Sequence, residues 1–289
     1  LPILQYLRED VRCTGTKEGC AEGDCGACTV VIGDLKADGD VEFKAVNACI
    51  QFLPTLDGNA LLTVEDVTDI GRQANPGSAD LHPCQEAMVS CHGSQCGFCT
   101  PGIVMSLVNL VQLKPKPARN EITDALSGNL CRCTGYRPII DATEKACEPG
   151  TGLKLDDSAD LPLLVEIRRA TTPTLSLEGD IIVQPVVRTR KGNEFVSPAT
   201  VAEVADYLVK HPSATLLAGS TEIGLQVNKQ FTRPEHIVYL GNVTALKQVQ
   251  DQGKHWRIGA VVPLSQIRSE EHTSELQSRL HLACRLLLE

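Results

Sequence analysis

Cysteine is the residue type that most constrains this chain. The sequence has 13 cysteines among 289 residues, and 12 of them lie before residue 151. Many stand only two to five positions apart, unlike the spread single cysteines of a short secreted disulfide framework. Such grouping suits metal chelation. Because thiolate ligands persist in a reducing compartment, the pattern predicts a cytoplasmic protein.

The first group of cysteines is Cys20-x4-Cys25-x2-Cys28, with Cys49 further along the chain. A [2Fe–2S] cluster needs four thiolates, and this is the spacing of a plant-type ferredoxin. Glycines between these cysteines let the backbone wrap closely round the sulfides. A zinc site would use paired CxxC knuckles and has no need of the four-residue gap. We therefore predict a [2Fe–2S] cluster here, with Cys49 open to the alternative of a buried apolar residue.

The second group consists of two pairs, Cys96 with Cys99 and Cys131 with Cys133. A CxxC pair serves zinc, redox disulfides and clusters alike. A pair separated by one residue is awkward for a zinc knuckle, although two pairs at helix ends can also hold zinc. The spacing alone therefore leaves zinc and iron–sulfur both open.

The remaining cysteines are single, and we predict that they are buried hydrophobes. His92 stands near the second group but is not predicted as a ligand, since four thiolates are already present. These single cysteines are Cys13, Cys84, Cys91, Cys147 and Cys284.

The first part of the chain is predicted to be rich in strands. After a short helix over residues 2–9, β-branched or alternating runs separated by glycine turns predict strands over 29–32, 41–46 and 61–64. Residues 71–80 contain Asn-Pro-Gly and are predicted to be a linker.

A helical rhythm follows and predicts a second domain of four short helices. Pro83 begins one helix, Thr100 caps the next, Asn120 caps a third, and Pro138 begins a fourth. Cysteines at the helix ends indicate a small bundle that clamps something at one pole.

Residues 151–192 are predicted to be an extended connector, and residues 193–267 an α/β region. This region has an amphipathic helix over 199–210 and strands over 215–218, 237–240 and 256–262.

The charge balance argues against two classes of partner. The net charge is −9, and no long basic stretch is present for nucleic acid or an anionic membrane. No apolar run approaches the roughly 18–20 residues that span a bilayer, and no secretory leader is visible. We predict neither a nucleic-acid nor a membrane partner, although the chain starts at Leu1 and its true start can be missing.

Four motifs resemble the molybdenum hydroxylases, and within that family the small iron–sulfur/FAD subunit of bacterial xanthine dehydrogenases. The resemblance covers about residues 1–267. The motifs are TGTKEGC at 14–20, GDCGACT at 23–29, SQCGFCTPG at 94–102 and GNLCRCTGYRP at 128–138.

The resemblance implies an α+β fold. Its parts are a β-grasp [2Fe–2S] ferredoxin domain over residues 1–72 that lacks its N-terminal strands, a four-helix [2Fe–2S] domain over 81–150, the linker, and a partial FAD-binding domain over 193–267. It also makes Cys96, Cys99, Cys131 and Cys133 the ligands of the second cluster. Gln95 matches a position that approaches a molybdopterin carried by a separate large subunit, and a surface glutamine is the alternative.

Residues 216–224 (LLAGSTEIG) read as a strand, a glycine turn and a helix start. Such a turn presents N–H groups and the positive end of the helix dipole to a phosphate. The motif is weak by itself, but in this context it resembles the FAD pyrophosphate loop. The residues that the resemblance assigns to FAD are Leu216, Leu217, Ala218, Gly219, Ser220, Thr221, Glu222 and Ile223.

The resemblance implies electron transfer from molybdopterin through two [2Fe–2S] clusters to FAD and then NAD, in hypoxanthine or xanthine oxidation. No catalytic residue is expected on this chain, and the assembly is expected to be a heterotetramer or larger. The alternatives are the equivalent part of an aldehyde oxidase or another heterocycle hydroxylase, and, from another class, a zinc or redox-sensing module. Residues 268–289 resemble translated adapter sequence, so we assign them no function and expect less than one FAD per chain.

Overall fold

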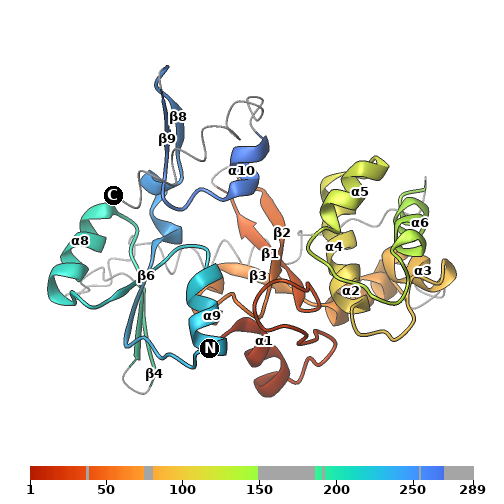
Figure 1. The fold of residues 1–289 in the computed structure, drawn as a ribbon, viewed down its shortest axis with the longest axis horizontal. Helices are drawn as coiled ribbons and strands as arrows, with labels where there is room; N and C mark the ends of the chain where they lie inside the picture. The colour runs from red at the N-terminus through yellow and green to blue at the C-terminus, as the bar shows by residue number, and fades with distance from the viewer. Residues whose placement is uncertain (37–38, 75–80, 149–185, 191–192, 254, 270–289) are drawn as a thin grey trace. The chain divides into compact units, whose positions relative to one another are not determined.

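The computed structural model describes the chain except for residues 37–38, 75–80, 149–185, 191–192, 254 and 270–289. The fold is a mixture of helices and strands, as predicted (Figure 1). It divides into two compact units. The first unit is Leu1–Val183 with Ser220–Arg233, and the second unit is Gln184–Gly219 with Pro234–Glu289.

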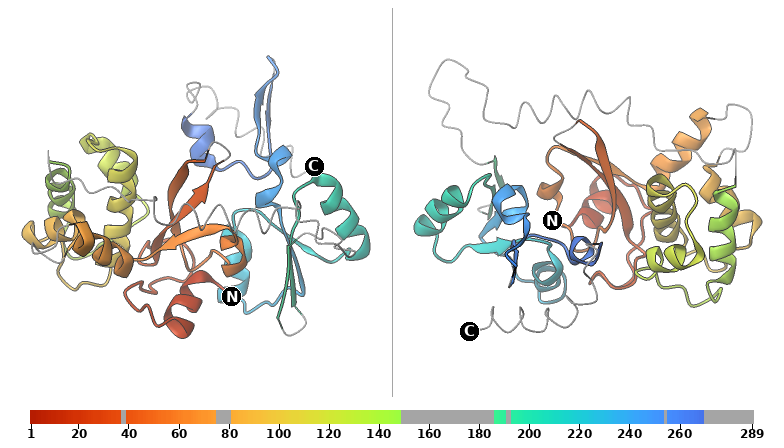
Figure 2. Two further views of the ribbon diagram at one scale, coloured as in Figure 1. Left: turned by 180° about the vertical axis from the view of Figure 1, so that it is seen from behind. Right: turned by 90° about the horizontal axis from the view of Figure 1, so that it is seen from above.

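The first unit contains a three-stranded antiparallel sheet in the order β2-β1-β3 (Figure 2). The strands are β1 (Thr29–Leu35), β2 (Val41–Asn47) and β3 (Asn59–Leu62). Side chains of β1 are buried on both faces, because successive residues of a strand point to opposite sides. Val31 belongs to a core shared with the helices, and Val30 to a second core on the other face. The predicted strands over 29–32 and 41–46 are confirmed, and each extends further.

The N-terminal segment is helical, as predicted. It consists of α1 (Ile3–Gln5), which runs directly into a π-helical segment, Tyr6–Asp10. The side chains of Ile3, Leu4 and Leu7 are buried there and pack in the same core as Val30.

Helix α2 (Val64–Ala74) corrects the sequence prediction. The strand predicted over 61–64 ends at Leu62, and the predicted linker begins inside this helix. The physical cause lies at Thr63, whose N–H and hydroxyl both donate to the Asp66 carboxylate, at 2.7 and 2.8 Å. A threonine followed by an acid three residues later is an N-terminal helix signal that the prediction missed.

The four predicted helices of the second domain are present. They are α3 (Pro83–Ser90), α4 (Thr100–Leu113), α5 (Arg119–Ala125) and α6 (Arg137–Ala146). Helix α4 is buried along most of its length and packs against β1 and β2, so helices and sheet share one core.

Two predicted helix caps are wrong by one or two residues. Helix α4 is preceded by Cys99 as its N-cap, and Thr100 is its first helical residue. Helix α5 begins after Ala118 rather than at Asn120, because the Glu121 carboxylate accepts from the Ala118 N–H at 2.7 Å. Glu121 is the third residue of the helix, and its carboxylate supplies the cap that the Ala118 side chain cannot supply.

The second unit contains a four-stranded sheet in the order β4-β5-β7-β6. Strands β5 (Asn193–Ser197), β7 (His236–Tyr239) and β6 (Thr215–Leu217) are parallel, and β4 (Val186–Arg190) is antiparallel to β5. Helix α8 (Val201–Lys210) follows β5. Strand β4 lies where the sequence predicted an extended connector, so that prediction is wrong for these five residues.

A hairpin and a short helix lie near the end of the described part of the chain. Strands β8 (Val249–Asp251) and β9 (Trp256–Ile258) pair as a hairpin, and α10 (Leu264–Ser269) follows. The remainder of the predicted connector, most of the predicted tail and Cys284 lie outside the described residues. Within the described residues, the helices are too short or too polar for any of them to cross a membrane.

Candidate functional site

The fold brings together Cys20, Cys25, Cys28 and Cys49, which we call the first quartet. Cys28 precedes β1 and Cys49 follows β2, and the pairing of these strands places both at one end of the sheet. A hydrogen bond from the Cys49 thiol lowers the pKa of Cys28 and raises that of Cys49. The charges of Cys25 and Cys20 act in the opposite direction on the pKa of Cys28 and raise it.

Backbone N–H groups point at the sulfur of the first quartet. The N–H groups of Glu22 and Cys25 both lie 3.4 Å from Cys20 Sγ. Burial raises the pKa of Cys20, but these hydrogen bonds outweigh it and lower the pKa overall. A side chain at Gly19 would place its Cβ 2.8 Å from Cys25 Sγ, so only glycine fits beside that sulfur. A loop with this donor set fits an anionic [2Fe–2S] cluster held by four thiolates.

The second quartet, Cys96, Cys99, Cys131 and Cys133, also comes together. Its members lie in the loop before α4 and in the turn before α6. A hydrogen bond with Cys96 is the main cause that raises the pKa of Cys133. Burial, followed by a hydrogen bond to Cys131, raises the pKa of Cys99 to about 12. The thiols therefore pair as Cys96 with Cys133 and Cys99 with Cys131, one from each segment.

Two residues that sequence reasoning did not single out hold the second quartet in place. The Tyr136 hydroxyl accepts from the Cys131 N–H at 2.8 Å. Asn129 is buried, its Oδ1 accepts from Ser106 Oγ at 2.7 Å, and its Nδ2 donates to the Gly26 carbonyl at 3.0 Å. Asn129 thus ties the second quartet's turn to the first quartet's loop. Both residues stand in the GNLCRCTGYRP motif at 128–138, and this position was the only signal that the sequence offered for their role.

A backbone hydrogen bond also joins the two quartets. The N–H of Leu130, the residue before Cys131, donates to the carbonyl of Cys25 at 2.9 Å. The path between these two cysteines therefore runs through covalent bonds and one hydrogen bond.

The two quartets differ in exposure. Cys28 and Cys49 of the first quartet are buried, whereas Cys96 and Cys133 of the second are exposed. Gln95, the predicted pterin-side residue, is also exposed and precedes Cys96. Phe98 and Leu130 are large apolar side chains at the second quartet, and they are 48% and 57% exposed.

The predicted flavin loop has the expected order of strand, glycine turn and helix. Strand β6 ends at Leu217, and α9 (Thr221–Lys229) begins after Ser220, which has a φ of +61°. Ser220 Oγ is buried and has no hydrogen-bond partner among the described residues. A Cβ added at Gly219 would meet no atom within 4 Å. An unpartnered hydroxyl at a helix N-terminus fits a phosphate group.

The other members of this predicted loop lie on both sides of the turn. Leu217 is buried and Leu216 is 47% exposed. Glu222 is an exposed acid in the first turn of α9, and its carboxylate accepts from Gln226 at 3.4 Å. The Glu222 side chain therefore interacts with another residue of α9.

Helix α9 packs against the first quartet. Asn228 Nδ2 donates to the carbonyls of Cys49 and Ala21, at 2.6 and 3.0 Å. A Cβ at Gly224 would lie 2.8 Å from the Ile50 carbonyl oxygen, so the helix approaches the turn closely. Sequence reasoning missed Asn228, because it lies 179 residues from Cys49.

Two domain families match this chain. Residues 63–144 match a [2Fe-2S] binding domain, and residues 190–287 match an FAD binding domain of molybdopterin dehydrogenase. The first range contains the second quartet, and the second contains the predicted flavin loop. The second range also covers most of the predicted tail.

The relatives in curated sequences are large oxidoreductases. Xanthine dehydrogenase of Emericella nidulans is 34% identical over 93% of this chain and 22% of its own length. Aldehyde oxidase 1 of Macaca fascicularis is 34% identical over 92% of this chain and 22% of its own. This chain thus spans about a fifth of the length of either relative.

A solved structure, quinoline 2-oxidoreductase from Pseudomonas putida 86, is 35% identical over 52% of this chain and 86% of that chain, with a TM-score of 0.41.

An iron–sulfur domain followed by an FAD-binding domain defines the class of this chain and confirms the predicted α+β fold class. Together with the relatives, the two domain matches support the molybdenum hydroxylase family, with [2Fe–2S] and FAD as cofactors.

Proposed function

We propose that this chain carries electrons inside a molybdenum hydroxylase, from a molybdopterin on a partner subunit to FAD. The observation that carries the proposal is the hydrogen bond from Leu130 to Cys25, which links two cysteine quartets within one packed unit. Each cluster supplies one-electron transfer, and a flavin can collect two electrons and pass on a hydride.

The first quartet and the second quartet would each hold one [2Fe–2S] cluster. In such a cluster each iron takes two of the four thiolates. The thiols that hydrogen-bond each other, Cys20 with Cys25 and Cys28 with Cys49, would together supply the four sulfur ligands of the first cluster. Around these sulfurs the protein supplies N–H donors and excludes water from the buried side.

Exposure gives the two clusters an order. The second quartet has two exposed cysteines beside exposed Phe98 and Gln95, which suits a face that meets the molybdopterin-binding large subunit. The first quartet is more buried and contacts α9, which begins at the predicted flavin loop. Electrons would therefore enter at the second quartet and leave from the first.

The proposed enzyme is of the xanthine dehydrogenase type, with hypoxanthine or xanthine as the reductant and NAD as the acceptor, in a heterotetramer or larger assembly. The aldehyde oxidase alternative rests on a specific observation, because the two kinds of relative are both 34% identical to this chain. Turnover of the chain with its large subunit, on xanthine and on an aldehyde, distinguishes them.

Metal content tests the iron–sulfur assignment against zinc. We expect about four iron atoms per chain and two distinct EPR signals after reduction, since each [2Fe–2S] cluster holds two irons. A zinc protein would be colourless, because Zn²⁺ is d¹⁰ and redox-silent. Iron and zinc are measured by elemental analysis of the purified chain, and zinc without iron would contradict the assignment.

The flavin assignment is tested at Ser220. We expect Ser220→Gly to weaken FAD binding at least tenfold, because a hydrogen bond to a charged group contributes about 1.5–3 kcal/mol and every 1.4 kcal/mol is a factor of about ten in affinity. Glycine removes the hydroxyl and tolerates the positive φ of this position. Ser213→Ala, at an exposed loop position, is the matched control. Flavin fluorescence titration measures the affinity, and equal affinity in both variants would contradict the role of Ser220.

A further inference from the structure

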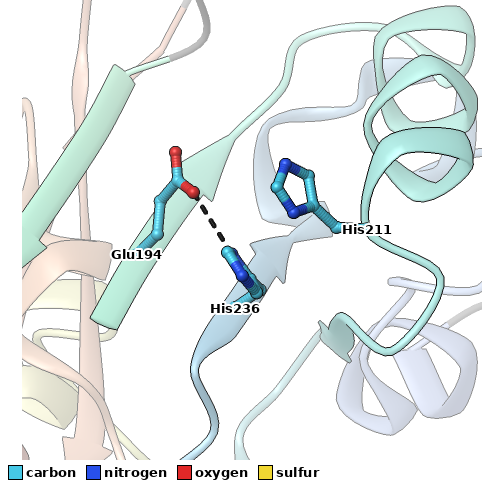
Figure 3. Close-up of side chains that lie close together, drawn as sticks. All are labelled: Glu194, His211 and His236. Atoms are coloured by element: carbon cyan, nitrogen blue, oxygen red, sulfur yellow. Dashed lines mark hydrogen bonds and ion pairs between the residues drawn. The ribbon is translucent and has the colours of Figure 1, made fainter. Parts of the chain in front are cut away.

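Two titratable side chains lie directly opposite each other in the sheet of the second unit. Glu194 on β5 is paired in parallel register with His236 on β7. Side chains at paired positions of neighbouring strands point to the same face. The third member of this triad is His211, which follows the last residue of α8. Figure 3 shows the three side chains converging from these three elements.

The donor atoms of this triad are close enough to share one ion. One carboxylate oxygen and one ring nitrogen from each histidine all lie within 4.8 Å of one another. Tetrahedral coordination at about 2.0–2.2 Å would place ligand atoms about 3.4 Å apart. Small side-chain rotations would therefore bring the three ligand atoms to coordination distance from one ion. The side chains of His236 and Glu194 are 23% and 24% exposed, so an ion would be half-enclosed.

Glu194 and His236 hydrogen-bond each other, whereas the His211 side chain contacts neighbouring rings. Glu194 Oε2 lies 3.2 Å from His236 Nδ1 and accepts from the Tyr207 hydroxyl at 2.9 Å. The His211 ring lies 4.3 Å from the His236 ring and 4.5 Å from the Tyr207 ring. Within the described part of the chain, neither ring nitrogen of His211 makes a hydrogen bond. Its ring nitrogens are free to bind a ligand.

We propose that Glu194, His211 and His236 bind a divalent transition-metal ion of the zinc type. Two imidazoles and one carboxylate are the donors that zinc accepts, whereas calcium and magnesium prefer oxygen alone. Three protein ligands leave a fourth position for water. This site is separate from both cysteine quartets and does not depend on the proposed electron transfer.

Tyr207 would serve as a positioning residue for the site. Its hydroxyl donates to the ligand carboxylate, and such an outer hydrogen bond orients a metal ligand. A bound ion would join two strands and the end of a helix, and it would stabilise the folded state because it binds only that state.

Zinc binding to the intact protein with its iron–sulfur clusters in place tests the proposal. After dialysis against Zn²⁺, we expect one zinc per chain without loss of iron. The X-ray absorption fine structure at the zinc edge should show nitrogen and oxygen neighbours at about 2.0–2.1 Å and no sulfur at about 2.3 Å. Sulfur in the first shell would mean that cysteines hold the zinc, and it would overturn the proposal.

Histidine variants supply the second arm of this test. His211→Ala removes no hydrogen bond of the described chain, so its fold should persist, and we expect zinc affinity to fall at least tenfold. His255→Ala, at an exposed position of the same unit, is the matched control and should bind as the parent does. Zinc should also raise the melting temperature of the parent and the control but not of His211→Ala. Equal zinc affinity in parent and His211→Ala would refute the site.

Discussion

Replacing Cys25 by serine should remove one of the two EPR signals of the reduced protein and leave the other. Cys25 lies in the first quartet, where its thiol interacts with Cys20. A serine hydroxyl is a poor iron ligand beside three thiolates, so this cluster would be lost or left incomplete. The second quartet draws its thiolates from other segments and should keep its cluster. Low-temperature EPR with power and temperature series separates the two signals.

The control for this experiment is Cys147→Ser, which changes a half-buried cysteine outside both quartets. It should retain both signals and the full iron content. Loss of both signals from a folded Cys25→Ser protein, or loss of neither, would contradict the assignment of two separate sites. Circular dichroism shows whether the variant has remained folded.

Replacing Gly102 by alanine should destabilise the contact between the two cluster domains. A Cβ at this position would lie 2.0 Å from the Gly26 carbonyl oxygen and 3.1 Å from the Ala27 backbone. Because the obstructing atoms are backbone, α4 or the first quartet's loop must move. Overpacking of this kind typically costs about 1–3 kcal/mol. We expect a lower melting temperature and a shifted EPR signal from the first quartet.

Gly128→Ala is a matched control, since a Cβ there would meet no atom within 4 Å. It should leave both the melting temperature and the EPR spectrum nearly unchanged. If Gly102→Ala melts at the same temperature as this control, the close approach of α4 to the first quartet's loop is not a constraint on the protein.

Local signals predicted the local structure well. Alternation of apolar and polar residues predicted strands β1 and β2. The positions of proline and glycine predicted the four helices of the helical domain and the turn before α9. Helix α2 was missed because its β-branched first residue, Val64, continued the strand pattern of β3, whereas the decisive cap is the Asp66 carboxylate. Strand β4 was missed because its pairing partner, β5, gives it the backbone bonds that make it a strand.

By itself, the sequence determined which cysteines belong to each local loop, because ligands two to five residues apart are constrained by the chain that joins them. Tertiary structure alone decided what those loops touch. The pairing of β1 with β2 brings Cys49 to Cys28, and one hydrogen bond from Leu130 joins the two quartets. Parallel pairing of β5 with β7 likewise unites Glu194 and His236, 42 residues apart. Contacts between such distant residues depend on how sheets and helices pack, and no local pattern in the chain encodes that packing.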